Sequence, residues 1–324
     1  MKTVPVQQAV GMALAHDLTQ IIIGGFEGAR FKKGHIVREE DIPVLLSMGK
    51  QNLFVLELGP EDVHEEEAAR RIAAAVTGPH VRAQDAGEGK VNLYAEVSGV
   101  LKVDEARLAQ LVDDDLVMLT TLPQNTPVNA GDLLAGTRVI PLYVKDSTVR
   151  RAESVGQVLQ VLPYQPLRVG VLSTGSEVYN GLIQDKFGPI LRQKFAALGC
   201  TVMDPLFADD NEQRIADKIR QLRDAGAQLI AVTGGMSVDP DDRTPAGIRL
   251  AGTQLESYGA PFLPGSMFLL GYLDGVTVVG LPGCVMHDEF TIFDVLVPRL
   301  VAGEHLTRAD VKALALGGLR SHTH

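Results

Sequence analysis

The chain of 324 residues has no tryptophan, only two cysteines and no long hydrophobic run. Without tryptophan it offers few of the aromatic platforms on which nucleobases stack. Cys200 and Cys284 are too far apart for a zinc motif, and they form no disulfide framework, which fits a reducing compartment. Apolar runs such as Val276–Val279 are too short to cross a bilayer, and no signal-peptide pattern precedes them. We therefore expect a cytoplasmic protein.

Positive charge is also scarce. The chain has 30 Lys+Arg against 40 Asp+Glu, a formal net charge of −10. This balance argues against nucleic acid or an anionic membrane as the main partner, although it leaves room for a local basic pocket that takes a small anion. Hydrophobic residues make up 45% and charged residues 22%, as in an ordinary globular protein. The length predicts at least two domains.

The first half is rich in strand-like segments. Helices are expected over residues 39–48 and 61–75, and the remaining pattern predicts a β-rich α+β accessory domain over residues 1–150, with a second option of two subdomains that divide near 60–90. Prolines at 163 and 166 predict a linker over residues 151–166, with a connecting helix over 150–162. The expected strands cover residues 20–23, 52–58, 96–103, 116–121 and 139–144.

From Leu167 onward, buried strands alternate with amphipathic helices. This alternation predicts an α/β domain with a largely parallel sheet over residues 167–305, followed by a tail over 306–324. The expected strands are 168–173, 200–204, 228–233 and 276–281, and the expected helices are 188–198, 210–224, 244–251 and 286–301.

Glycine-rich and acidic loops follow the carboxyl ends of these strands. They cover residues 173–177, 204–210, 233–237 and 281–284. Ligands of open α/β sheets bind at this edge, and glycines allow backbone N–H groups to approach an anion closely. Taken singly, each loop is equally typical of a tight turn between a strand and a helix. None matches a Walker A or GxGxxG pattern, so a standard NTPase or nicotinamide enzyme is not expected.

Three acidic positions allow two interpretations each. Asp241 and Asp242, which precede Thr244-Pro245, are suited to Mg²⁺ shared with a phosphate, or to capping a helix. Asp185, before Gly188-Pro189, is a candidate of the same kind, with a capping or turn role as its alternative. The acids of the His287-Asp288-Glu289 run are expected in the first turn of the last helix, where they complement its dipole. Cys284 is interpreted as a small loop residue.

The ordered set of loops resembles the molybdopterin-binding domain shared by molybdenum-cofactor biosynthesis proteins. The matching residues span about 167–303, and the first half is distantly similar to the accessory region of molybdopterin molybdotransferases through residues 34–36 and 129–132. The matching elements are Ser173-Thr174-Gly175-Ser176-Glu177, Asp185 with Gly188-Pro189, Thr233-Gly234-Gly235, Asp242 with Thr244-Pro245, and Gly280-Leu281-Pro282-Gly283.

The resemblance implies a three-layer fold and a site for the phosphate of molybdopterin, with or without a nucleotide. In the adenylyltransferase branch, two aspartates at the places of Asp185 and Asp242 support Mg²⁺-dependent transfer of AMP from ATP to molybdopterin. In the molybdotransferase branch, molybdate is inserted instead. We expect a small-molecule pterin phosphate as partner and a homo-oligomer, either dimer or trimer. The expected binding residues are Thr174, Gly175, Ser176, Glu177, Thr233, Gly234, Gly235, Ser237, Pro282 and Gly283.

Two other functions remain open from the sequence. The run Asp241-Asp242-Arg243-Thr244 after Gly234-Gly235 also resembles competence/damage-inducible proteins with nucleotide pyrophosphatase activity. The third interpretation is a non-catalytic protein that stores or senses molybdopterin. The chain departs from the transferase pattern in that Ser266 stands where a lysine is expected and Cys284-Val285 where Asn-Pro is usual.

Overall fold

The structure is a computed structural model, and it describes residues 2–21, 27–55, 59–237, 239 and 242–320. The chain divides into two compact units, which are described separately. Unit 1 comprises Met1–Glu96, Leu101–Gln124 and Ala130–Val161, and unit 2 comprises Val97–Val100, Asn125–Asn129 and Leu162–His324. Within the described ranges, no helix combines the length and apolarity that a membrane span requires.

The centre of unit 2 is a seven-stranded sheet, most of whose neighbouring strands run parallel. Its central strand is buried along its whole length, as is typical of a parallel sheet that is covered on both faces. At one edge of the sheet, the last two strands run antiparallel to their neighbours in turn: the second-last strand pairs antiparallel with both the strand before it and the edge strand. The order is β15 (Thr201–Val202), β14 (Arg168–Thr174), β17 (Leu229–Thr233), β20 (Val276–Leu281), β19 (Leu269–Leu273) and β18 (Gln254–Tyr258), with β16 (Leu206–Ala208) also paired to β14.

The strand register decides where the loops begin. Ser173 of β14 lies opposite Thr233 of β17, and Thr233 lies opposite Leu281 of β20. The three central strands therefore end at nearly the same level, and the loops that follow them leave from one edge. The outer neighbour of β14 is divided: β15 pairs with Arg168 and Val169, whereas β16 pairs with residues 172–174.

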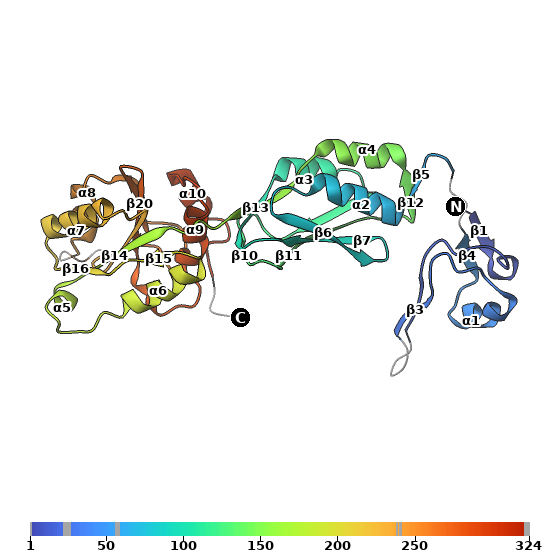
Figure 1. Ribbon diagram of the computed structural model, residues 1–324, viewed down its shortest axis with the longest axis horizontal. Coiled ribbons are helices and arrows are strands. Elements are labelled where there is room, and N and C mark those ends of the chain that lie inside the picture. The colour runs from blue at the N-terminus through green and yellow to red at the C-terminus, as the bar shows by residue number, and fades with distance from the viewer. Residues whose placement is uncertain (1, 22–26, 56–58, 238, 240–241, 321–324) are drawn as a thin grey trace. The chain divides into compact units, whose positions relative to one another are not determined.

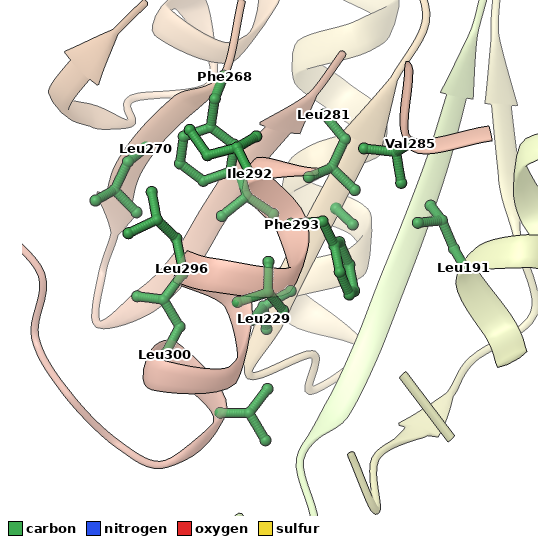
Figure 2. Packing of buried hydrophobic residues seen from close by; sticks show 14 of the residues in the cluster. Leu191, Leu229, Phe268, Leu270, Leu281, Val285, Ile292, Phe293, Leu296 and Leu300 are labelled. Carbon is green, nitrogen blue, oxygen red and sulfur yellow. The ribbon is translucent and has the colours of Figure 1, made fainter. Parts of the chain in front are cut away.

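Helices cover both faces of this sheet (Figure 1). On one face, α6 (Phe187–Ala197) and α9 (Ile292–Val301) bury apolar side chains against the strands, as Figure 2 shows for Leu191, Phe293 and Leu296. On the other face, α7 (Glu212–Asp224) and α8 (Thr244–Leu250) contribute to a second cluster. Each fully buried large apolar side chain contributes about 2 kcal/mol. The result is the expected three-layer α/β arrangement.

Shorter elements complete unit 2. They are α5 (Ser176–Tyr179), the 3-10 turn η3 (Gly283–Met286) and α10 (Arg308–Ala313). In α9, Thr291 and Asp294 form a capping box, which satisfies N–H groups at the start of the helix.

Unit 1 begins with small antiparallel pairs around their own core. That core includes Val6, Leu14, Leu18, Phe31 and Leu45. The elements are β1 (Lys2–Pro5) paired with β4 (Asn52–Val55), β2 (Leu18–Ile21) paired with β3 (Glu27–Phe31), η1 (Val6–Gln8), η2 (Glu39–Asp41) and α1 (Ile42–Ser47).

The rest of unit 1 contains a four-stranded antiparallel sheet that packs against helix α2 (Glu65–Val76), whose buried face includes Ile72 and Val76. The sheet order is β6 (Val81–Gly87), β7 (Lys90–Ala95), β11 (Leu133–Val139) and β9 (Val117–Thr121). The other elements of unit 1 are β5 (Asp62–His64), β12 (Tyr143–Lys145), α3 (Glu105–Leu111) and α4 (Asp146–Val155). Three further strands pair in the order β10 (Pro127–Val128), β8 (Gly99–Val103) and β13 (Leu159–Pro163); β10 belongs to unit 2, and β8 and β13 have residues in both units.

Several expected elements of the first half differ in the structure. The helix over 39–48 is divided into η2 and α1, because Pro43 favours a fresh helix start. Residues 62–64 of the expected helix 61–75 pair with β12 as a strand instead. The expected strand 139–144 is interrupted at Pro141. The connecting helix ends at Val155, and β13 follows it. Residues 22–23 and 56–58 of two expected strands lie outside the described residues.

In the second half, the expected helix 286–301 begins only at Ile292. Asp288 and Glu289 therefore precede α9 rather than lying in its first turn, and the acid in that turn is Asp294. Strands β18 and β19 and the short β16 were not predicted.

Candidate functional site

A cavity of about 750 Å³ lies where the loops after β14, β16 and β17 meet. A second cavity of about 320 Å³ shares five lining residues with the first: Phe187, Gly234, Gly235, Asp242 and Met286. Most expected site residues line one of the two. Thr174, Gly175, Glu177, Asp185, Gly234, Gly235 and Asp242 line the larger cavity, whereas Ser237, Pro282 and Gly283 line the smaller one.

Two expected residues, Ser176 and Thr233, are not among the lining residues of either cavity. Ser176 donates from its backbone N–H and its hydroxyl to the Asp210 carboxylate, at 2.9 and 2.7 Å. Thr233 is fully buried, and its hydroxyl oxygen has no hydrogen-bond partner within the described residues. Ser176 thus holds Asp210, which lines the larger cavity.

Buried hydroxyls connect the first loop to the second. The Thr174 hydroxyl donates to the carbonyl oxygen of Thr233 at 3.0 Å, and its oxygen lies 2.7 Å from that of Thr244. Because Thr174 has one hydroxyl hydrogen, this arrangement makes Thr244 the donor of the shorter bond. The ends of β14 and β17 are thereby tied to the start of α8, which keeps the cavity in shape.

The two glycines after β17 are required by close packing. A Cβ at Gly234, whose φ is +89°, would lie 2.2 Å from the carbonyl oxygen of Thr174. At Gly235, with φ +51°, it would lie 2.8 Å from the Thr244 hydroxyl oxygen. Only glycine fits both the left-handed backbone and the available space, so the peptide groups of this loop approach the first loop closely.

Asp185 has hydrogen-bond partners at the start of α6. Its carboxylate accepts from the backbone N–H of Phe187 at 3.0 Å and of Gly188 at 3.2 Å. The hydroxyl of Ser173 donates a longer bond of 3.4 Å. The capping or turn alternative describes these contacts, although the residue directly before α6 is Lys186, and the same half-buried carboxylate also lines the larger cavity.

Asp242 differs from Asp185. The residue before α8 is Arg243, and no side chain caps that helix. Within the described residues, the half-buried Asp242 carboxylate makes no hydrogen bond, although its backbone N–H donates to Asp239 at 2.9 Å. The capping alternative is wrong for Asp242, which lines both cavities. Asp241, the other member of the expected pair, lies outside the described residues.

The described wall of the larger cavity is acidic. Five carboxylate residues line it against one cation, Lys186. Two nearby cations are already paired, because Arg243 contacts Glu212 at 3.2 Å and Lys194 contacts Asp294 at 2.7 Å. The five are Glu177, Asp185, Asp210, Asp239 and Asp242. A bare phosphate would be repelled by this wall, so an anionic ligand requires a counter-cation here.

The structure adds residues that the sequence did not single out. Asp210 follows β16 at the same edge of the sheet. The sequence signal that could have singled it out is its place in the acidic loop 204–210. Phe187, Ile183 and Met286 add apolar surface to the cavity. Burial raises the pKa of the Cys284 thiol, with Asp288 adding to the effect, so Cys284 is not an activated nucleophile.

A comparison with known proteins matches the segment that carries this cavity. Residues 170–302 match a family model described as a probable molybdopterin binding domain. Residues 3–57 match a second family, described only as a domain of unknown function.

Curated relatives cover parts of the chain. A molybdopterin molybdenumtransferase of Haemophilus influenzae is 30% identical over 150 residues, which is 44% of this chain and 37% of the relative. A CinA-like protein of Mycolicibacterium gilvum is 34% identical over 90 residues, or 28% of this chain and 21% of the relative. The chain thus spans less than half the length of these relatives.

Among solved structures, the molybdopterin biosynthesis enzyme MoaB from Thermus thermophilus aligns over 43% of this chain and 98% of its own, at 22% identity and a TM-score of 0.35. The molybdopterin biosynthesis MoeA protein from Pyrococcus horikoshii aligns over 93% of this chain and 74% of its own, at 15% identity and a TM-score of 0.35.

Proposed function

We propose that unit 2 binds molybdopterin or its nucleotide form in molybdenum-cofactor biosynthesis, with the ligand's phosphate held at the larger cavity through Mg²⁺. The acidic wall is the observation that carries the proposal. A cavity with five carboxylates and one lysine, within a molybdopterin-binding domain, takes a phosphate only together with a divalent cation.

The residues present fit such a cation. Mg²⁺ prefers oxygen ligands and is commonly held by one or two carboxylates plus substrate phosphates rather than by a complete protein cage. No group of three or more acidic, histidine or cysteine residues in the described ranges is arranged to hold a metal alone. Asp242, whose carboxylate has no hydrogen-bond partner among the described residues, is the main proposed ligand. Asp185, which the N–H groups of α6 orient, is the second.

For the reaction, we favour adenylyl transfer. An oxygen of the molybdopterin phosphate attacks the α-phosphorus of ATP, the bond to the β-phosphate breaks, and pyrophosphate leaves. When bound, Mg²⁺ would neutralise phosphate charge. The chain contributes by positioning: Gly234 and Gly235 admit the phosphates close to the backbone, and the threonine network holds the loops in place. Insertion of molybdate at the same site is the other transferase option.

The decisive experiment is a titration of the purified chain with molybdopterin, with and without Mg·ATP, in which both pterin binding and pyrophosphate release are followed. Binding with release supports adenylyl transfer. Binding without release excludes adenylyl transfer and favours molybdate insertion or a carrier and sensor role. Whether or not pyrophosphate is released, we expect removal of Mg²⁺ to abolish pterin binding. Absence of binding under all conditions would refute the molybdopterin proposal.

The second candidate is a nucleotide pyrophosphatase, which the similarity to CinA-like proteins favours. Such an enzyme would cleave ADP-ribose without any pterin. The two cavities, with their five shared lining residues, suit a substrate of two parts in either case. Release of AMP from ADP-ribose by the pterin-free protein would select this function over the transferase.

Location and assembly complete the proposal. We expect the protein to act in the cytoplasm as a homo-oligomer, a dimer or a trimer, with neither nucleic acid nor membrane as a partner. Size-exclusion chromatography with light scattering measures the mass of the assembly, and a monomer at micromolar concentration would contradict the oligomer.

A further inference from the structure

Unit 1 contains a further cavity, whose lining is basic where that of the larger cavity of unit 2 is acidic. It has a volume of about 600 Å³, and residues from β3 to α1 line it. Four of its eight lining residues are basic or histidine and one is acidic: Arg30, Lys32, Lys33, His35 and Asp41. Such a concentration of positive charge is unusual in a chain with a formal net charge of −10. It belongs to the segment that matches a domain of unknown function.

The backbone under this cavity is held on both sides. The amide of His35 donates to the carbonyl of Lys32 at 3.0 Å, which closes a turn in which Gly34 has a φ of +79°. The Gly34 amide donates to Leu14 at 2.8 Å, and the Lys33 amide donates to the Asp17 carboxylate at 2.7 Å. The charged side chains therefore project from a fixed base.

Lys33 and His35 already have acidic partners. Lys33 donates to the Glu66 carboxylate at 2.5 Å, and His35 lies 2.6 Å from the carboxylate of Asp41. Arg30 and Lys32 are different, because neither has an ion pair or hydrogen bond from its side chain to the described residues. Most other arginines of the chain pair with an acidic group or contact a ring.

The cavity brings these two cations together. Arg30 lies at a register shift of β3, Lys32 directly follows that strand, and both line the same cavity. Phe31 between them points the other way: it is 8% exposed and packs into the core of unit 1. Both cations are exposed beside the cavity. Guanidinium and ammonium groups so placed bind the oxygens of phosphate groups.

We propose that Arg30 and Lys32 form an anion-binding site for a phosphate or pyrophosphate group of a small molecule, separate from the molybdopterin-binding domain. The site does not depend on the function proposed for unit 2. Its charge requires no divalent cation, whereas the acidic cavity requires one, and this difference makes the two sites distinguishable by experiment.

The probe is inorganic pyrophosphate in metal-free buffer at low ionic strength, with binding measured by titration calorimetry. The test variant is Arg30→Ser combined with Lys32→Ser. The matched control is Lys2→Ser combined with Arg38→Ser, which removes the same net charge from exposed positions of the same domain outside the cavity. Circular dichroism checks that both variants stay folded.

We expect the natural sequence and the control to bind one pyrophosphate per chain, and the test variant to bind about tenfold more weakly, since each exposed charged contact contributes modestly. Arg30→Lys with Lys32→Arg, which keeps both charges, should retain binding if the serine variant fails to fold. Equal binding by the test variant, or no binding by the natural sequence, would overturn the site. Equally tight binding of citrate would overturn its assignment to phosphate.

Discussion

The larger cavity of unit 2 and the cavity of unit 1 have opposite charge and are built in different ways. The cavity of unit 2 has five carboxylates and one lysine, and loops from three strands of one sheet form it. The cavity of unit 1 has two cations without a partner among the described residues, beside Lys33, which Glu66 neutralises, and residues 30–35 supply most of its lining. Under our two proposals, phosphate groups are bound in two ways: by carboxylates that need a metal, or by cations that act directly.

The largest effect is expected from the glycine loop of the acidic cavity. Gly234→Ala should lower the free energy of unfolding of unit 2 by about 3 kcal/mol, because its Cβ would overlap the Thr174 carbonyl. Gly275→Ala is the control: it also has a positive φ, but no atom lies within 4 Å, so about 1 kcal/mol is expected. Urea unfolding followed by circular dichroism measures both. Equal losses would show that close packing does not constrain this loop.

Asp242→Asn tests the role of the metal. We expect Mg²⁺-dependent turnover to fall roughly a hundredfold, because the carboxylate, which has no hydrogen-bond partner among the described residues, loses its charge. The thermal melt should be unchanged, since the carboxylate makes no hydrogen bond within the described residues. Glu289→Gln, an exposed acid outside both cavities, is the control. Normal turnover in a folded Asp242→Asn protein would remove Asp242 from the mechanism.

A smaller effect is expected from the threonine network behind the acidic wall. Thr174→Val keeps the shape of the side chain but removes both hydroxyl contacts, and we expect a loss of about 1.5 kcal/mol in the free energy of unfolding. Thr201→Val, at an exposed position of β15, should change stability by less than about 0.5 kcal/mol. If the two variants unfold alike, the network does not stabilise the cavity.

The smallest effect concerns pH and the basic cavity. Partial burial would raise the pKa of Asp41, but the hydrogen bonds from His35 and from the Arg38 amide outweigh it, and the pKa lies below its usual value of 3.8. A lowered pKa in the folded state adds stability above about pH 4, and this is lost as the pH falls through the folded value. Asp41→Asn should therefore flatten the acid dependence of the stability of unit 1. Parallel acid-unfolding curves for both proteins would contradict this.

The sequence predicted the parts of the site that depend on local pattern. The ends of β17 and β20 were expected where they occur, because apolar runs stop there at glycine and proline. Strand β19 was missed since Gly271 interrupts its pattern, and the structure gives the reason: a Cβ there would lie 2.7 Å from the Thr253 side chain. That constraint comes from another segment of the same chain, the residues before β18, and has no local signal.

Long-range pairing explains what else the sequence did not reveal. The contact of Ser176 with Asp210 joins residues 34 apart, so Asp210 was expected only as part of a loop. The pairing of Lys33 with Glu66 also joins residues far apart in the sequence. This pairing distinguishes Lys33 from Arg30 and Lys32 in the basic cavity. Which charges remain unpaired is decided by tertiary contacts, and the sequence shows only their number.

The divided strand beside β14 has a consequence for solubility. An exposed sheet edge is a template on which other chains can add strands and aggregate. Here the outer edge is formed by two short strands, β15 and β16, and Asp204 and Pro205 lie between them. Proline lacks an N–H donor and the aspartate carries charge, so an incoming strand finds no continuous ladder to extend. The break in this strand thus protects the sheet from edge-to-edge association.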